Sequence, residues 1–374
     1  MKKYNNGLII GKFMPFHLGH EELITFGLER SHHLTIGVCS ISSEPIPGEV
    51  RYKRVKDTYK EYSNISVIHI TEDLPSSSES SREISLLRST YLKKEFPTVD
   101  VIFTSEPYGD YVAEYMNIDH VCFDLSRNII PISGTMIRNN PLHYRNYLNQ
   151  YAKSYFTKKI IIVGSESTGK STMTQLLANY YDTTYVPEMA RLIISHTNTV
   201  TYNDLYHIAH LHYKEIKKRE KTANKFLFID SDISITESYS QFLFKKKLIV
   251  GENIRKTNIG DLYLFLNTDC PYTQDGTRIE ENRRKNLEES HKRQLRENNI
   301  DYHVITGSDW NQRFEQCITI INNHFISLYN THHDGNNLTL SEHQYHYLHD
   351  RRLSDELYRI CRNIIQHTMC VSRI

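Results

Sequence analysis

Gly164-Ser165-Glu166-Ser167-Thr168-Gly169-Lys170-Ser171-Thr172 is the stretch that decides the fold of the second half of this chain. It follows the apolar run 160–163 and leads into the helix-like segment 172–178. A glycine loop between a strand and a helix predicts phosphate binding, because its backbone N–H groups can surround a polyphosphate. Lys170 is then expected to reach the terminal phosphates, and the Ser171 hydroxyl to hold Mg²⁺. The sequence therefore predicts that this half binds a nucleoside triphosphate.

Length and composition limit the class of protein. The 374 residues suffice for two domains, and the glycine loop lies too far along the chain to belong to the first. With 45 basic and 44 acidic residues, the chain shows no charge excess suited to nucleic acid or an anionic membrane. No apolar run approaches the length of a membrane span, and the N-terminus does not resemble a secretory signal. Six scattered cysteines favour reduced thiols and a cytoplasmic protein.

Strand-like and helix-like segments alternate on both sides of residue 150. Such alternation predicts an α/β fold with doubly wound parallel sheets, whose ligands bind at the carboxyl ends of the strands. We expect domains at 1–150 and 158–328, followed by a C-terminal tail, 329–374, of unknown role. The expected strands of the first domain are 8–12, 34–39, 65–70, 99–104 and 120–123. Those of the second are 160–163, 226–229, 262–266 and 302–305. Residues 76–81 are expected to form a polar loop, and residues 348–365 a helix.

A second phosphate-binding motif stands at the first strand–helix junction, within Gly11-Lys12-Phe13-Met14-Pro15-Phe16-His17-Leu18-Gly19-His20. Two histidines three apart on the opening turn of a helix face the same way. Their imidazoles can donate hydrogen bonds to an α-phosphate as it becomes five-coordinate. This stretch resembles the H-x-G-H signature of the nucleotidyltransferase superfamily. Ser133, Thr135 and Arg138 suit the other phosphates of ATP, although hydroxyls at a helix start are ordinarily caps.

Further segments carry a closer resemblance. Residues 103–110, 124–127, 47–51 and 137–141, taken with both nucleotide motifs, resemble the NadR-type bifunctional enzymes. These join nicotinamide mononucleotide (NMN) adenylyltransferase to ribosylnicotinamide kinase, and the resemblance covers roughly residues 7–320. It implies a Rossmann-like nucleotidyltransferase domain followed by a P-loop kinase domain. Members that repress transcription carry a helix-turn-helix segment ahead of the first domain. The first expected strand begins within about ten residues of Met1, so we do not expect a DNA-binding role.

The resemblance implies roles for particular residues of the first domain. The NMN phosphate would attack the α-phosphorus of ATP and expel pyrophosphate, and no protein group need act as a covalent nucleophile. His17 and His20 are the expected catalytic pair. The expected ATP-binding residues are Gly11, Lys12, Phe13, His17, His20, Ser133, Thr135 and Arg138. The expected NMN- or NAD-binding residues are Ser105, Glu106, Tyr108, Gly109, Asp124 and Arg127. For Tyr108, simple packing is an equal alternative.

The kinase domain has its own expected set. Asp230 ends a buried strand beside the glycine loop, so it can hold Mg²⁺ with Ser171 or accept a proton from the riboside 5′-hydroxyl. Glu188 is the second candidate for that base, and the sequence does not settle the order. The expected catalytic residues are Lys170, Asp230 and Glu188; the riboside-binding residues are Glu188, Arg191, Asp230 and Asp232. Arg278 and Arg283 are expected to join residues 164–172 on ATP. The alternatives are an i,i+3 ion pair for Glu188 and Arg191, a solvent-facing position for Asp230 and Asp232, and a solvated helix for the arginine-rich segment.

Histidines gather at 207–212 and in the tail at 332–349 without cysteines nearby, which favours solvated helices over a metal site. We expect Mg²⁺ as cofactor and ATP, NMN, nicotinamide riboside and NAD as small-molecule partners, and no nucleic acid or membrane. The sequence leaves three questions open: whether the protein forms a homo-oligomer, whether NAD regulates either site, and which half is more active. Two alternatives are a nucleotidyltransferase–kinase pair with another acceptor, and a nucleotide-sensing regulator that binds without turnover.

Overall fold

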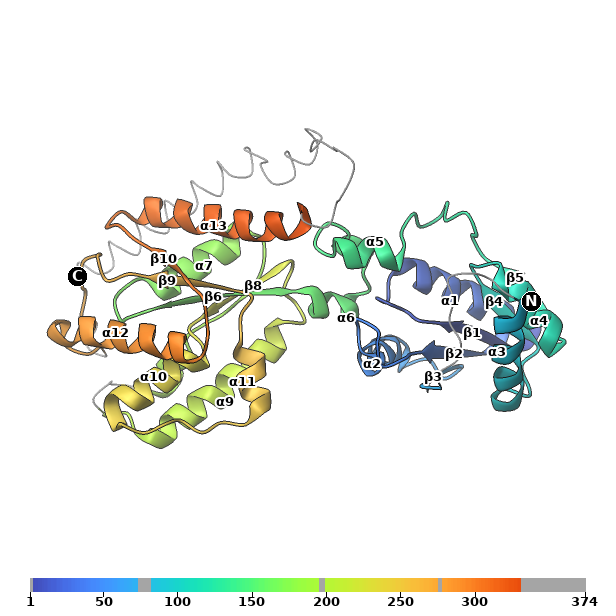
Figure 1. Cartoon of the computed structure of the whole chain (residues 1–374), viewed down its shortest axis with the longest axis horizontal. Helices are drawn as coiled ribbons and strands as arrows, with labels where there is room; N and C mark the ends of the chain where they lie inside the picture. Colours follow the sequence, from blue (N-terminus) through green and yellow to red (C-terminus); the bar gives the residue numbers. More distant parts are fainter. Residues whose placement is uncertain (1–2, 73–81, 195–198, 275–277, 331–374) are drawn as a thin grey trace. The chain divides into compact units, whose positions relative to one another are not determined.

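The computed structural model describes residues 3–72, 82–194, 199–274 and 278–330, and the chain divides into two compact units (Figure 1). The units are Met1–Phe156 and Thr157–Ile374. Each unit is built around its own five-stranded parallel sheet. This confirms the α/β fold class with two doubly wound sheets.

The sheet of the first unit has the strand order β3-β2-β1-β4-β5. Its strands are β1 (Tyr4–Gly11), β2 (Ser31–Cys39), β3 (Ile65–Ile70), β4 (Val101–Thr104) and β5 (Asp119–Cys122). Its helices are α1 (Leu18–Arg30), α2 (Gly48–Tyr59), α3 (Arg82–Glu95), α4 (Tyr108–Met116), α5 (Gly134–Asn139) and α6 (Gln150–Lys153). β1 pairs with both β2 and β4, so the strand order reverses beside β1. A crevice at such a switch point is where doubly wound sheets bind ligands.

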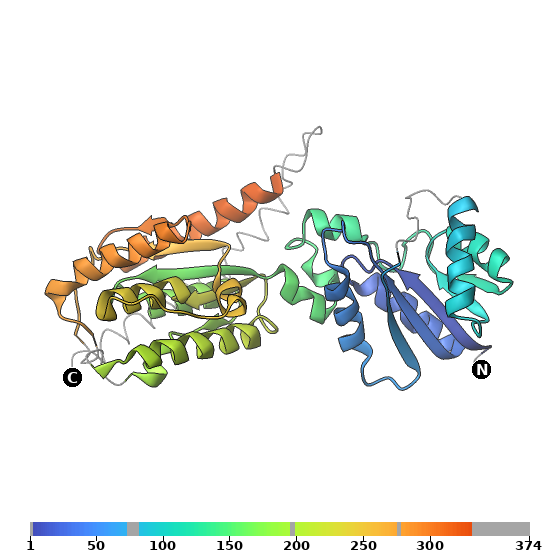
Figure 2. The same cartoon turned by 60° about the horizontal axis from the view of Figure 1, so that its bottom comes forward.

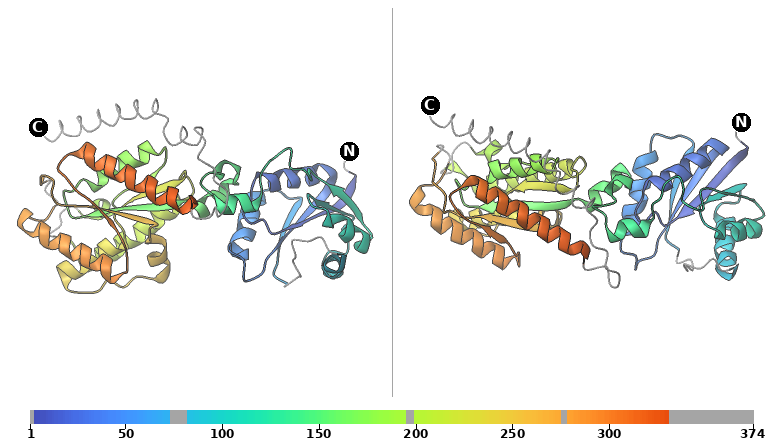
Figure 3. Two further views of the ribbon diagram at one scale, coloured as in Figure 1. Left: turned by 45° about the horizontal axis from the view of Figure 1, so that its top comes forward. Right: turned by 90° about the horizontal axis from the view of Figure 1, so that it is seen from above.

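Alternating side chains of β1 build the two halves of this unit's core. Ile9 packs with Ile24 of α1 and Val55 of α2 on one face. Leu8 and Ile10 pack on the opposite face, against α3 and α4. Figure 3 shows α3 and α4 on the side of the sheet away from α1. Because both faces are covered, Leu8, Ile9 and Ile10 form a continuous apolar run, as expected for a buried parallel strand.

The sheet of the second unit has the order β10-β9-β6-β8-β7. Its strands are β6 (Lys158–Gly164), β7 (Tyr185–Val186), β8 (Phe226–Asp230), β9 (Leu262–Leu266) and β10 (His303–Ile305). Its helices are α7 (Lys170–Tyr180), α8 (Ala190–Ile193), α9 (Tyr202–Arg219), α10 (Ile233–Phe244), α11 (Glu252–Asn258), α12 (Glu281–Glu297) and α13 (Trp310–Asn330). In Figures 1 and 2, α7 and α13 cover one face of the sheet, and α9, α10 and α12 the other. The central strand β6 therefore delivers the glycine loop into the middle of the unit.

Most differences from the expected elements concern short or polar segments. β7 is only two residues long, which is too short to show a pattern. The buried residues of α2 are Arg51, Val55 and Tyr59. Because Arg51 is charged, the sequence does not show an apolar face for this helix. The expected loop 76–81 and the expected tail helix 348–365 lie outside the described residues. Within the described part of the chain, no helix is both long and apolar enough to cross a membrane.

Candidate active sites

The glycine loop between β6 and α7 has the backbone geometry that its sequence requires. Gly164 and Gly169 have φ angles of +146° and +79°, a region that favours glycine. At Gly169, an added Cβ would lie 2.0 Å from a ring carbon of Trp310, the first residue of α13. The loop therefore curls at the N-terminus of a well-packed helix, where backbone N–H groups favour phosphate.

The loop's functional side chains meet the end of β8. The Ser171 hydroxyl donates to Asp230 Oδ2 at 2.5 Å, and Lys170 Nζ donates to the Ser165 carbonyl at 3.1 Å. Asp230 is almost completely buried, and its second oxygen, Oδ1, has no hydrogen-bond partner among the described residues. Burial, with the nearby negative charge of Glu188, raises the pKa of Asp230 to about 7. The structure thus brings together both residues expected to hold Mg²⁺.

A cleft opens beside this contact and contains the expected riboside-binding residues. Glu188, Arg191, Asp230 and Asp232 all line it. Arg191 Nε donates to Glu188 Oε2 at 3.0 Å, which is the i,i+3 pair considered above. Asp232 caps α10: its Oδ1 accepts from the Ile235 amide at 3.1 Å, and its Oδ2 from the Tyr263 hydroxyl at 2.9 Å. Burial raises the pKa of Asp232 to about 6. Asp232 therefore already has a structural role at the cleft wall.

Of the two arginines near α12 that were expected to bind ATP, only one lies at the cleft. Arg278 lines the cleft, whereas Arg283 lies over the Phe242 ring, with its guanidinium 5.2 Å from the ring centroid. Arg284, the residue after Arg283, is buried and reaches the glycine loop. It donates to the carbonyls of Glu166 and Ser167, at 2.9 and 3.0 Å. The Glu166 carboxylate accepts from the Tyr239 hydroxyl at 3.1 Å and from the Ile279 amide at 2.5 Å, so both of its oxygens are hydrogen-bonded.

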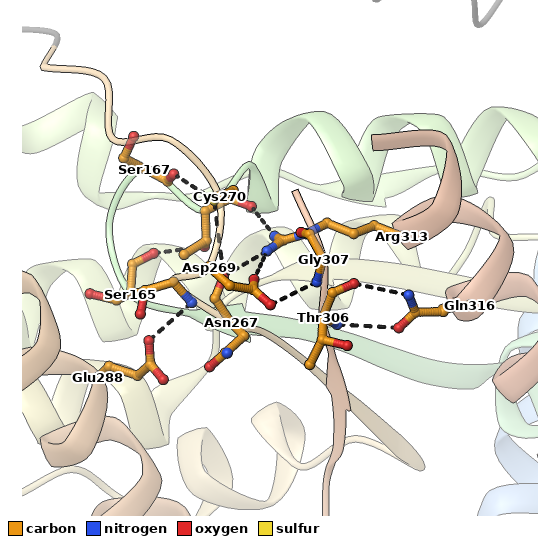
Figure 4. A network of polar contacts seen from close by, with 12 residues as sticks. Ser165, Ser167, Asn267, Asp269, Cys270, Glu288, Thr306, Gly307, Arg313 and Gln316 are labelled. Atoms are coloured by element: carbon orange, nitrogen blue, oxygen red, sulfur yellow. Dashed lines mark hydrogen bonds and ion pairs between the residues drawn. The ribbon is translucent and has the colours of Figure 1, made fainter. Parts of the chain in front are cut away.

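A second buried arginine supports the loop from α13. Figure 4 shows Arg313 beside Asp269, Asn267 and Gly307, in the loops that follow β9 and β10. It donates to the Gly307 carbonyl at 2.5 Å and the Asn267 carbonyl at 2.9 Å, and it pairs with the Asp269 carboxylate. A longer contact of 3.4 Å reaches the Thr168 carbonyl of the glycine loop. Arg313 thus ties three loops together at the phosphate end of the site.

In the first unit, the structure places the two histidines of the H-x-G-H motif face to face at the start of α1. Their rings are 3.7 Å apart between centroids. His20 Nδ1 accepts the backbone N–H of His17 at 3.3 Å, so its proton resides on Nε2. Burial, with a smaller contribution from Arg127, lowers the pKa of His17 to about 4, and burial lowers that of His20 well below its usual value. His20 is therefore neutral, with one ring N–H free to donate.

The segments expected to bind the other ATP phosphates flank this pair. Arg138 of α5 donates to the Met14 carbonyl at 2.6 Å and to the Thr135 hydroxyl at 2.9 Å. Ser133 caps α5 by accepting the Met136 amide at 3.1 Å, as the alternative of a helix cap foresaw. The side chain of Phe13 is buried in the core, so only its backbone faces a ligand. Gly134 lies so close to Met14 that a Cβ would stand 2.5 Å from its carbonyl oxygen.

Lys12 follows β1 and is held in a network that sequence reasoning missed. Its Nζ lies 3.0 Å from Glu44 Oε1, and the buried Arg51 pairs with the other oxygen of Glu44. Arg51 also donates to the Cys39 carbonyl at 3.0 Å. Burial alone would raise the pKa of Glu44, but Lys12, the Ile41 amide and Arg51 together lower it. The ionised Glu44 therefore fixes Lys12 near the carboxyl end of the sheet.

The expected NMN-binding residues have mixed surroundings. Tyr108 is half-buried and donates to the Ile10 carbonyl at 3.3 Å, which agrees with the packing alternative. Gly109 lies against His120, since a Cβ there would stand 2.2 Å from the imidazole. Arg127 is exposed, but its charge acts on both motif histidines. Asp124 accepts the Asn128 amide at 2.7 Å and shapes the loop that carries Arg127. Ser105 is half-buried and Glu106 is exposed, and both directly follow β4.

The two units together define a class of protein: a two-domain α/β protein with a glycine-containing loop after the central strand of each sheet. A family described as "AAA domain" matches residues 159–313, which contain the glycine loop. Over most of its length the chain is similar to NadR proteins. It is 27% identical over 343 residues to the trifunctional NAD biosynthesis/regulator protein NadR of Escherichia coli (strain K12), covering 86% of this chain and 83% of that protein.

Two solved structures have the same fold over nearly the whole chain. A NadR protein in complex with NR superimposes with a TM-score of 0.70 and 20% identity, covering 90% of this chain and 100% of the other. A NadR protein in complex with NAD and AMP-PNP gives a TM-score of 0.68 and 20% identity, covering 91% and 100%. At this identity the likeness is one of fold, and it extends through both units.

Proposed function

We propose that this chain has two activities: its second unit phosphorylates nicotinamide riboside with ATP, and its first unit transfers the adenylyl group of ATP to the resulting NMN, giving NAD and pyrophosphate. The observation that carries the proposal is that the similarity to NadR covers 86% of this chain, which is more than either unit alone, so it extends into both units. The geometry of each site then supports its own reaction.

In the kinase site, the phosphates of ATP would lie in the glycine loop, with Lys170 released from the Ser165 carbonyl to contact them. The donor set fits Mg²⁺, because Ser171 Oγ and the unpartnered oxygen of Asp230 stand together at the loop. When bound there, the ion would neutralise charge on the transferred phosphoryl group. Contact with Ser171 favours this role for Asp230 over that of base.

Glu188 is then our candidate for the base at the riboside 5′-hydroxyl. It lines the cleft, and its side chain is 20% exposed. Its carboxylate is held by Arg191, which fixes its direction. A carboxylate near the attacking hydroxyl can accept its proton as the phosphoryl group is transferred.

In the adenylyltransferase site, the chemistry rests on alignment and charge stabilisation. The substrate supplies the attacking oxygen, so no residue forms a covalent bond. His20 offers its Nε2–H to the reacting phosphate, since its Nδ1 already accepts the His17 amide. Lys12 and Arg138 would add positive charge around the leaving pyrophosphate, and Arg127 would contact NMN.

Two variants test the proposal. Lys170→Ala should lower riboside phosphorylation at least about 100-fold and leave adenylyl transfer to NMN unchanged, and His20→Ala should do the reverse. The purified variants would be incubated with ATP, Mg²⁺ and either substrate, and NMN and NAD would be measured by mass spectrometry. The proposal fails if folded wild-type protein forms neither product, or if one variant abolishes both reactions.

A further inference from the structure

Three buried polar atoms without a hydrogen-bond partner among the described residues belong to side chains that line one cleft, the one beside Asp230. They are Asp230 Oδ1, Ser231 Oγ and His212 Nε2. Leaving a buried polar group unpaired is unfavourable, so folded proteins pair nearly all of them. Ser231 also has a φ angle of +67°, an unfavourable conformation for a residue with a side chain. Several such costs at one cleft point to a ligand that supplies the missing partners.

The hydrogen bonds around His212 decide what its free nitrogen can do. Asn258 Nδ2 donates to the Ile254 carbonyl at 2.8 Å, which turns the Asn258 Oδ1 oxygen toward the imidazole. His212 Nδ1 lies 2.8 Å from that oxygen. An amide oxygen only accepts, so Nδ1 must carry the proton of the neutral ring. Nε2 is therefore a hydrogen-bond acceptor and cannot donate.

The surroundings keep His212 in this state. Its side chain is 5% exposed, and burial lowers its pKa to about 4, so the ring is neutral at physiological pH. His212 lies on α9 four residues after Ile208 and seven after Leu205, which places the three on one helix face. All three line the cleft. Glu188 acts electrostatically on His212 and is therefore nearby.

The side chains that line the cleft are of three kinds. Lys170 and Asp230 mark the phosphate end, and Leu205 and Ile208 belong to an apolar end suited to a flat base. His212 shares its helix face with Leu205 and Ile208, and Glu188 is close enough to act on it. If Glu188 faces the 5′-hydroxyl, the sugar is the part of the nucleoside nearest to His212.

We propose that His212 determines specificity in the kinase site, its Nε2 accepting a hydrogen bond from the 2′- or 3′-hydroxyl of the ribose. This proposal rests on the proposed kinase function. A site built to hydrogen-bond a substrate hydroxyl strongly rejects the analogue that lacks it, because the buried protein group then stays unpaired. The site therefore selects ribonucleosides over a matching deoxynucleoside.

The test compares kcat/KM for nicotinamide riboside with that for its 2′-deoxy and 3′-deoxy analogues. We expect the wild-type protein to prefer the riboside to one of the analogues by at least about 100-fold. His212→Leu should lower kcat/KM for the riboside about 10- to 100-fold, mainly through KM, and leave that analogue nearly unaffected, so the preference collapses. His212→Gln, whose amide oxygen can accept, should recover part of the preference. His207→Leu is the matched control, because His207 is an exposed residue of the same helix.

A structural role would give a different result. If His212→Leu reduced turnover of all three substrates equally, or if the wild-type protein used both analogues as well as the riboside, the proposal would be overturned. Thermal unfolding of each variant shows whether the fold is kept. If another riboside but not nicotinamide riboside is phosphorylated, the proposed substrate is wrong, and the same comparison on that riboside and its deoxy forms still decides the role of His212. If no riboside is phosphorylated, both proposals fail.

Discussion

Gly169 is held against the Trp310 ring at the turn where the glycine loop becomes α7. Its φ angle of +79° and the 2.0 Å approach of a Cβ to that ring both exclude a side chain. We expect Gly169→Ala to destabilise the second unit by about 1–3 kcal/mol and to weaken ATP binding. Gly251 has open space around it, so Gly251→Ala should cost at most about 1 kcal/mol. Urea unfolding followed by Trp310 fluorescence measures both, and equal losses would contradict this account.

Asp230 should make the stability of the second unit depend on pH. Its carboxyl has a pKa of about 7 in the folded protein and near 3.8 when exposed. Between these values the folded state keeps a proton that the unfolded state has released, so stability falls as pH rises from about 4 to about 7. Asp230→Asn has no charge to bury. It should be more stable than the wild type above pH 7, by at most about 4 kcal/mol, with the difference shrinking toward pH 4. A difference that does not change with pH would refute this.

Contacts that follow from a local sequence pattern or from adjacent parallel strands were predictable. Contacts between residues far apart in sequence, without such a pattern, were not. The stacking of His17 on His20 follows from their spacing on one helical turn. The contact of Ser171 with Asp230 follows from two adjacent parallel strands that end at the same edge. By contrast, Arg313 contacts Thr168 across 145 positions of sequence, and no local pattern indicates such a contact. Arg284 is buried and the neighbouring Arg283 is exposed, and an arginine-rich segment alone does not show which of its arginines is buried.

At the scale of elements, α13 stabilises the loops around the phosphate site. Arg313 is fully buried on this helix and satisfies carbonyls of two other loops as well as Asp269. Arg313→Met would leave these groups unpaired, so we expect a loss of about 3–5 kcal/mol in the stability of the second unit. Arg293→Met on α12 is the matched control, because Arg293 is exposed. Urea unfolding of both variants checks this, and similar midpoints would show that the network contributes little.

Strands that are buried on both faces were predictable, whereas the helices α2 and α11 were not. A strand such as β9, covered on both sides, is apolar at every position and stands out between polar segments. α2 and α11 bury polar residues, Arg51 in one and Asn258 in the other, so their inner faces do not show an apolar repeat. Both buried groups are paired in the structure, which is why the helices tolerate them.

At the scale of the whole molecule, the sequence predicted two domains because two different phosphate-binding motifs each follow a buried strand. Each motif lies at the carboxyl end of the central strand of its own sheet. What the sequence could not show is how each site is supported. Glu44 and Arg51 fix Lys12 in one unit, and Arg284 and Arg313 hold the glycine loop in the other. These supports come from loops and helices that only the folded topology brings together.

Two sites in separate units should bind nucleotide independently, and the chain offers a natural reporter for one of them. Trp310 is its single tryptophan and touches the glycine loop at Gly169. Adding ATP should therefore change tryptophan fluorescence through the second unit alone. The change should persist in His20→Ala and disappear, or require at least about 100-fold more ATP, in Lys170→Ala. Calorimetry on the same samples should count two bound nucleotides per wild-type chain and one in each variant. A fluorescence response lost in His20→Ala would mean that the sites are coupled, and a single bound nucleotide in the wild type would leave only one of the two loops in use.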